Sequence, residues 1–118
     1  MDKRLVDSEL KIMNVIWREG DLPARRIAEI LKDETGWNVN TTYTLIKRCI
    51  EKGAVRRDDP GFLCHALVEK TEVQEAETES LLDKIFDGSA SMLFASLISS
   101  KKVSKEEIDE MKRLIDQM

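Results

Sequence analysis

The first half of this chain contains three segments in which apolar side chains recur at the three- and four-residue spacing of α-helices. The first segment follows Asp7, a favourable helix N-cap, and the second opens with Asp21-Leu22-Pro23. The third covers residues 38–52, and its apolar stripe consists of Thr42, Leu45, Ile46, Cys49 and Ile50. This stripe predicts that the third helix docks on the first two.

A β-hairpin pattern follows the third helix, after Gly53 at the position of a C-cap glycine. Two short strand-like runs, residues 54–57 and 62–68, flank the turn sequence Asp58-Asp59-Pro60-Gly61. Three helices followed by a hairpin is the element order of a winged helix-turn-helix. We therefore expect residues 1–70 to form such a domain, with the hairpin as its wing.

The remainder of the chain, residues 71–118, predicts three more short helices. The last of them begins with a capping box at Ser104. Three short helices cannot close a core alone, so their apolar stripes need a partner, and a second copy of the chain is the simplest one. We therefore expect a mostly α protein in which residues 71–118 form a helical dimerisation domain. The residues expected at the dimer interface are Leu81, Ile85, Leu93, Leu97, Ile108, Met111, Leu114 and Ile115.

The polar face of the third helix carries side chains that suit contact with DNA. Its members recur at the i, i+3, i+4 and i+7 positions of one helical face. Asparagine pairs with adenine edges, threonine offers a hydroxyl or a methyl group, and lysine and arginine reach guanine or phosphate. A tyrosine on the exposed side of a short helix is poorly explained by packing. The residues expected to contact double-stranded DNA here are Asn40, Tyr43, Thr44 and Lys47, with Thr41 and Arg48 at the margins.

Two pairs of arginines outside the third helix are further candidates for phosphate contacts. Arg25 and Arg26 lie at the start of the second helix, close to where free N–H groups favour an anion. Arg56 and Arg57 alternate faces on the first strand of the wing, so only one of them is expected to face DNA. The acidic turn that follows them would repel phosphate, which predicts a weak or short contact by the wing.

The overall charge looks wrong for a nucleic-acid binder, but its distribution explains it. Residues 1–70 carry 13 lysines and arginines against 12 acidic residues, whereas residues 71–118 carry 6 against 11, so the net charge of −4 comes from the second part. No apolar run is long enough to span a bilayer and no signal-peptide pattern is present, so we expect a cytoplasmic protein without membrane insertion. In that compartment the two cysteines, Cys49 and Cys64, are not expected to form a disulfide.

The chain lacks the residue patterns of an enzyme. It has one histidine, no glycine-rich phosphate loop and no spaced nucleophile–base pair. Cys64 and His65 are adjacent, but neighbours on a strand point to opposite faces and no further ligand lies nearby in sequence. We therefore expect no catalysis, no metal and no cofactor.

The chain resembles the penicillinase and methicillin-resistance repressor family at residues 37–53, which read W-N-V-N-T-T-Y-T-L-I-K-R-C-I-E-K-G. That family shows a tryptophan, a threonine-rich helix start, then Thr-Leu, Arg and Lys-Gly at these spacings. The similarity extends to residues 10–17, to residues 62–69 and to V-S-K-E-E-I-D-E-M near the end. The resemblance implies a winged-helix homodimer, joined through its C-terminal helices, that represses β-lactamase or related resistance and stress genes from a palindromic operator.

The resemblance also implies a partner, a membrane-linked sensor protease that inactivates such repressors by cleavage in the C-terminal region. Members cleaved in this way have an Asn-Phe bond in the short apolar helix, and the matching position here is Ser96-Leu97. The sequence therefore does not predict cleavage at this bond.

The alternative function is a winged-helix module for protein association without DNA, in which the polar face of the third helix would be a protein epitope.

Overall fold

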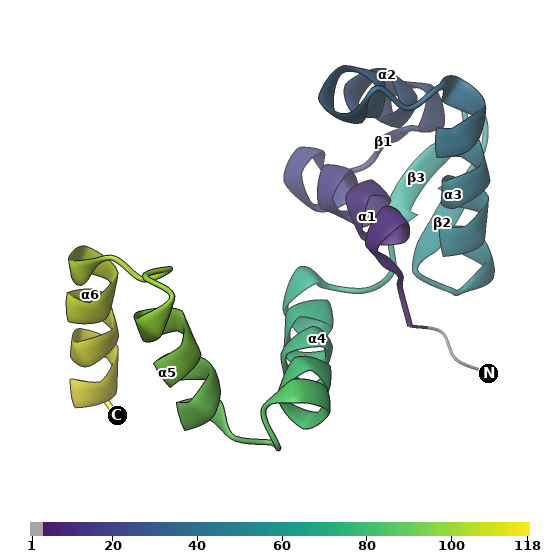
Figure 1. Ribbon diagram of the computed structural model, residues 1–118. Helices are drawn as coiled ribbons and strands as arrows, with labels where there is room; N and C mark the ends of the chain where they lie inside the picture. Colours follow the sequence, from purple (N-terminus) through teal and green to yellow (C-terminus); the bar gives the residue numbers. More distant parts are fainter. Residues whose placement is uncertain (1–3) are drawn as a thin grey trace. The chain divides into compact units, whose positions relative to one another are not determined.

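The structure of the protein is a computed structural model that describes residues 4–118 (Figure 1). Its contacts divide the chain between Val73 and Gln74 into two compact units. The first unit holds three helices and three short strands, and it ends within the first turn of a fourth helix. Its elements are α1 (Asp7–Glu19), β1 (Leu22–Pro23), α2 (Ala24–Thr35), α3 (Val39–Glu51), β2 (Val55–Asp58), β3 (Leu63–Ala66) and the start of α4 (Lys70–Ile85).

The predicted winged helix-turn-helix is confirmed in the first unit. Helices α1, α2 and α3 pack against one another, and β2 and β3 form the antiparallel hairpin of the wing (Figure 1). The core contains the apolar faces of all three helices, with Ile12, Ile27 and Ile46 fully buried. Each such side chain contributes roughly 1.5–3 kcal/mol by leaving water. The packing of these faces fixes α3 on α1 and α2, as its stripe predicted.

The predicted second helix begins later than expected, because Leu22 and Pro23 form strand β1 instead. Strand β1 pairs antiparallel with β3, with Leu22 opposite Cys64, and the sheet order is β1-β3-β2. Pro23 lacks an N–H group, which suits it to the edge of a sheet. The Leu22 side chain is buried, so the strand brings an apolar residue into the core while it starts α2 at Ala24.

The N-terminus of α1 also differs from the prediction. The residue at the cap position is Val6, whereas Asp7 is the first helical residue. The capping acceptor is Glu9, whose Oε1 accepts a hydrogen bond of 2.9 Å from the Val6 N–H. Glu9 is 1% exposed and its Oε1 lies 2.6 Å from Nζ of Lys52, the C-cap residue of α3. This ion pair therefore joins the start of α1 to the end of α3.

The electrostatics of Glu9 follow from these two contacts. Burial alone would raise the pKa of its carboxyl, because it disfavours the charged form. The hydrogen bonds from Lys52 and from the Val6 N–H favour the charged form and outweigh burial, so the pKa of Glu9 lies below its usual value. The side chain is therefore an ionised, partnered group inside the domain at neutral pH.

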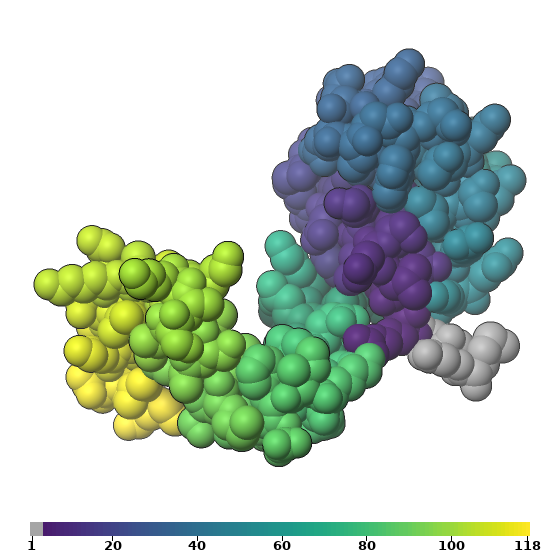
Figure 2. Space-filling view, in the orientation of Figure 1, coloured from purple at the N-terminus to yellow at the C-terminus, as the bar shows by residue number. Residues whose placement is uncertain are grey.

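The second unit contains the rest of α4 together with α5 (Ala90–Ser99) and α6 (Lys105–Asp116). The predicted capping box at Ser104 is confirmed, since Ser104 Oγ accepts from the Glu107 N–H at 3.1 Å and Glu107 Oε1 accepts from the Ser104 N–H at 3.1 Å. None of the three helices buries a single side chain. Side chains of α5 and α6 lie open at the surface drawn in green to yellow in Figure 2.

No helix within residues 4–118 is both long enough and apolar enough to cross a membrane.

Candidate nucleic-acid interface

The polar face of α3 lies at the surface as predicted. Asn40, Thr44 and Lys47 are exposed along its centre, with Thr41 and Arg48 exposed on one side. Among residues 4–118, Lys47 and Arg48 have no ion-pair partner. The face therefore presents a carboxamide, hydroxyl groups and two free cations in one patch, which is the mixture of groups that reads base edges and phosphates.

The start of α3 is held by its own cap. Asn38 is the N-cap residue, and its Oδ1 accepts a hydrogen bond of 2.8 Å from the Thr41 N–H. One of the free N–H groups that we expected to attract phosphate is therefore already satisfied. Thr44 Oγ donates to the carbonyl of Asn40 at 2.9 Å, so its hydroxyl offers an external ligand only its lone pairs.

A shallow hollow of about 540 Å³ lies beside the N-terminal half of α3. It places Ser8 of α1 and Trp37 next to the exposed side chains of α3. Sequence reasoning missed Ser8, because its position next to α3 arises from helix packing and has no sequence pattern. The hollow is lined by Ser8, Trp37, Asn38, Asn40, Thr41, Thr44, Leu45 and Arg48.

Tyr43 was expected to contact DNA because packing did not explain a tyrosine on the exposed side of the helix. That argument is wrong, because packing does explain its position. The ring is half-buried and meets Phe62 of the wing in an edge-to-face contact, with 5.7 Å between ring centres and an angle of 82°. Such pairs contribute about 0.5–1.5 kcal/mol beyond the area that they bury. Tyr43 therefore links α3 to the wing, and its hydroxyl has no hydrogen-bond partner in the described part of the chain.

The two arginines of the wing are paired with the acidic residues of the turn. Arg56 makes two parallel contacts with Asp58, Nε to Oδ1 at 3.0 Å and Nη2 to Oδ2 at 3.2 Å. This fork holds the pKa of the Asp58 carboxyl below its usual value. Arg57 uses only Nε, which lies 3.1 Å from Asp59 Oδ2. The acidic turn is thus largely neutralised within the wing, which weakens the repulsion expected from its sequence.

The arginines at the start of α2 are both exposed, but they differ in their contacts. Arg26 Nη1 lies 3.1 Å from Glu29 Oε2, whereas Arg25 has no ion-pair partner among the described residues. The first N–H of α2, on Ala24, donates to the carbonyl of Phe62 at 2.9 Å. The start of α2 is therefore tied to the tip of the wing.

The remaining groups with possible chemistry are structural in their contacts. His65 Nδ1 lies 2.9 Å from Asp21 Oδ1 and so joins β3 to the residue before β1. Burial raises the pKa of the Cys49 thiol to about 12 and that of Cys64 to about 11, so both stay protonated at neutral pH. Within residues 4–118 no three His, Cys, Asp or Glu side chains gather as metal ligands would.

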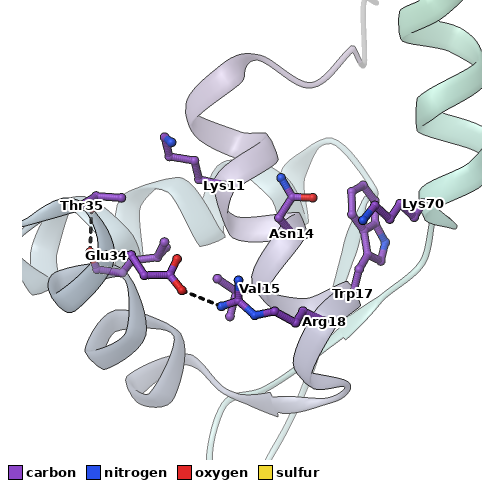
Figure 3. A pocket seen from close by; sticks show the side chains of 9 residues that line it. Lys11, Asn14, Val15, Trp17, Arg18, Glu34, Thr35 and Lys70 are labelled. Atoms are coloured by element: carbon purple, nitrogen blue, oxygen red, sulfur yellow. Dashed lines mark hydrogen bonds and ion pairs between the residues drawn. The ribbon is translucent and has the colours of Figure 1, made fainter. Parts of the chain in front are cut away.

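A second hollow, of about 480 Å³, lies between α1, α2 and the start of α4 (Figure 3). An ion pair lies inside it, with Arg18 Nη2 at 2.8 Å from Glu34 Oε1. On the other side Trp17 Nε1 donates to the carbonyl of Val68 at 3.0 Å, which fastens the segment before α4 to α1. Lys11 and Lys70 stand at its rim in Figure 3.

Comparison with known proteins gives consistent matches over most of the chain. A family model described as "Penicillinase repressor" matches residues 5–117. The methicillin resistance regulatory protein MecI of Staphylococcus aureus is 25% identical over 111 residues, which cover 92% of this chain and 90% of that protein. The penicillinase repressor of Bacillus licheniformis is 23% identical over 116 residues, which cover 97% of this chain and 91% of that protein.

A solved structure is also similar to this chain. It is the solution structure of the DNA-binding domain of the repressor BlaI, with a TM-score of 0.55 and 25% sequence identity. The match covers 59% of this chain and 88% of that domain.

Proposed function

The chain belongs to the penicillinase repressor family, and we propose that it is a homodimeric transcriptional repressor that binds a palindromic DNA operator. The observation that carries the proposal is the exposed polar face of α3 in a domain that matches 88% of a solved repressor DNA-binding domain. The relatives are named as regulators of methicillin resistance and of penicillinase. We propose β-lactamase or related resistance and stress genes as the genes under control.

In this proposal α3 is the recognition helix and enters the major groove. Asn40, Thr44 and Lys47 lie at the centre of its exposed face, where Asn40 and Thr44 reach base edges and Lys47 reaches a backbone phosphate. Thr41 and Arg48 flank them, and Arg25 at the start of α2 reaches the phosphates of the adjacent backbone. In the wing, Arg57 is the better placed arginine, because Asp58 occupies both Nε and Nη2 of Arg56.

The proposed dimer interface lies in residues 74–118. Apolar side chains there remain exposed in a single chain, with Ile85 at 66%, Leu114 at 58% and Ile115 at 62%. Leu81 is also exposed, and Leu93, Leu97, Ile108 and Met111 are half-buried. A second copy of the same surface would remove these side chains from water. A two-fold axis between two recognition helices then requires two half-sites of opposite orientation in the operator.

A membrane-linked sensor protease is the partner that the family resemblance implies. The bond at the matching position, Ser96-Leu97, lies within helix α5. A protease needs an extended backbone, so cleavage there would first require α5 to unfold locally.

The test begins with selection of bound DNA from a pool of random duplexes, followed by measurement of affinity across a series of salt concentrations. Arg25, Lys47 and Arg48 have no ion-pair partner within residues 4–118, which gives six free cations in a dimer. At about 0.9 log units per neutralised phosphate, the plot of log K against log salt should have a slope of about −5 or steeper.

Two variants sharpen this test. Lys47→Gln should reduce the slope by about 1.8 in a dimer, because two phosphate contacts are lost. Lys11→Gln removes a lysine of the α1 hollow instead, so it should leave the slope unchanged. Failure to select any sequence, or an affinity independent of salt, would contradict DNA binding and favour the protein-association module.

A further inference from the structure

Phe62, at the tip of the wing, has an unusual backbone conformation for its size. Its φ is +50°, in the left-handed region, where a bulky side chain strains the backbone. The residue before it, Gly61, also has a positive φ, but glycine adopts that conformation without strain. Glycine or asparagine would satisfy the backbone at position 62 better, so an aromatic ring there is best explained by what the ring contacts.

The Phe62 ring joins two parts of the proposed DNA-binding surface. Its centre lies 5.7 Å from that of Tyr43 on α3, in an edge-to-face contact. Cζ of Arg57, on β2, lies 3.7 Å from the same ring centre, so the guanidinium stacks against the ring. The Phe62 carbonyl also accepts the Ala24 N–H at the start of α2. One residue therefore contacts α2, α3 and the wing.

The Arg57 guanidinium is held in place but keeps N–H donors that are free to bind a ligand. Its Nε lies 3.1 Å from Asp59 Oδ2, and Asp59 Oδ1 in turn accepts the Phe62 N–H at 3.3 Å. Its two terminal amino groups have no hydrogen-bond partner within residues 4–118. Together these two amino groups carry four N–H donors in one rigid plane, an arrangement that can bind a phosphate in two places. Arg56 differs, because Asp58 already accepts hydrogen bonds from its Nε and Nη2.

We propose that Phe62 is a positioning residue for DNA binding: its ring holds Arg57 so that the two free amino groups meet a backbone phosphate beside the groove that α3 enters. The inference rests on the proposed function and adds to it the residue that positions the arginine of the wing. Holding the guanidinium in advance removes part of the entropy cost of ordering a long side chain on binding.

The experiment measures DNA affinity against salt for the full chain and for variants at both positions. Phe62→Asn keeps a residue that tolerates positive φ but removes the ring. It should weaken binding roughly tenfold per half-site at about 0.1 M salt and lower the slope by about 0.9 per protomer, the share of one phosphate. Arg57→Gln should have the same effect. Phe62→Tyr retains the ring and should restore wild-type affinity and slope.

The double variant Phe62→Asn/Arg57→Gln separates positioning from a general loss of structure. If Phe62 acts through Arg57, the double variant should bind no more weakly than Arg57→Gln alone. Additive losses, or an unchanged slope in Phe62→Asn, would overturn the inference. If Phe62→Asn fails to fold, an unchanged slope in Arg57→Gln overturns it equally. Each of these outcomes leaves salt-dependent binding by the wild type intact, whereas absence of that binding would contradict the proposed function itself.

Discussion

Removing Lys52 should destabilise the winged-helix domain, because it leaves the buried carboxylate of Glu9 without its cation. Lys52→Met keeps most of the length of the side chain but leaves the Glu9 carboxylate, which is 1% exposed, without its cation. Removing one partner of a buried ion pair typically costs 3–5 kcal/mol, roughly, because the other charge remains buried. Here the Val6 N–H still donates to Glu9, and the Lys52 side chain is 25% exposed, so water can replace part of the interaction. We expect a loss of about 2–3 kcal/mol in the free energy of unfolding.

The loss should depend on pH with a definite sign. In the wild type the pKa of Glu9 is lowered, so the stability that it contributes is present above the unfolded pKa and is lost as pH falls through the folded value. Without Lys52 the strongest influence that lowers the pKa of Glu9 is gone, so this pKa should rise, because burial is then opposed only by the Val6 N–H and Arg48. Acid then protonates the unpaired carboxylate and removes the buried charge that destabilises the variant. The difference between the two proteins should therefore shrink as the pH falls from neutral toward about 4.

The assay is urea unfolding followed by tryptophan fluorescence at fixed protein concentration, since both tryptophans, Trp17 and Trp37, lie in the first unit. Lys11→Met removes an exposed lysine from α1 and should change stability by no more than about 0.5 kcal/mol. Glu9→Gln combined with Lys52→Met leaves no buried charge and should recover much of the loss. Coincident unfolding curves for Lys52→Met and the wild type, or a loss that stays constant with pH, would refute the reasoning.

Two further substitutions test the core and the proposed dimer interface. Thr42 Oγ1 is buried and has no hydrogen-bond partner among the described atoms, so Thr42→Val should raise the free energy of unfolding by about 1 kcal/mol; a variant less stable than the wild type in the same urea assay would show that the hydroxyl is satisfied. Leu114→Asp places a charge on an exposed apolar position of α6 and should give monomers in sedimentation velocity, whereas Gln117→Asp, with the same charge change, should leave the dimer intact. A dimeric Leu114→Asp would contradict the assignment of the interface.

The three helices of the first unit could be predicted from sequence because each of them carries its own periodic pattern. The stripe of α3 gave its core side, and the opposite positions gave its exposed face, without reference to any other part of the chain. Strand β1 could not be predicted in this way. It is two residues long and exists only because β3, some forty residues later, supplies its hydrogen-bond partners.

The same limit applies to the candidate interface. Asn40, Thr44 and Lys47 were found from their spacing, and their contact with DNA remains a prediction. The burial of Glu9 was missed because its cation lies 43 residues away on α3. Phe62 was missed for a similar reason, since its contact with Tyr43 connects a helix to a turn that no periodicity relates. Pairings between distant segments require the folded structure.

The two buried thiols also allow the opening of the first unit to be measured directly. Cys49 and Cys64 are both 0% exposed, and their raised pKa values keep them in the unreactive thiol form. An alkylating reagent therefore reaches them only while the winged-helix domain is open, and the rate of labelling counts those openings. Residues 74–118 contain no cysteine, so they contribute no signal. The rate of labelling with and without DNA would thus measure how often the winged-helix domain that carries α3 opens, with no probe added to the protein.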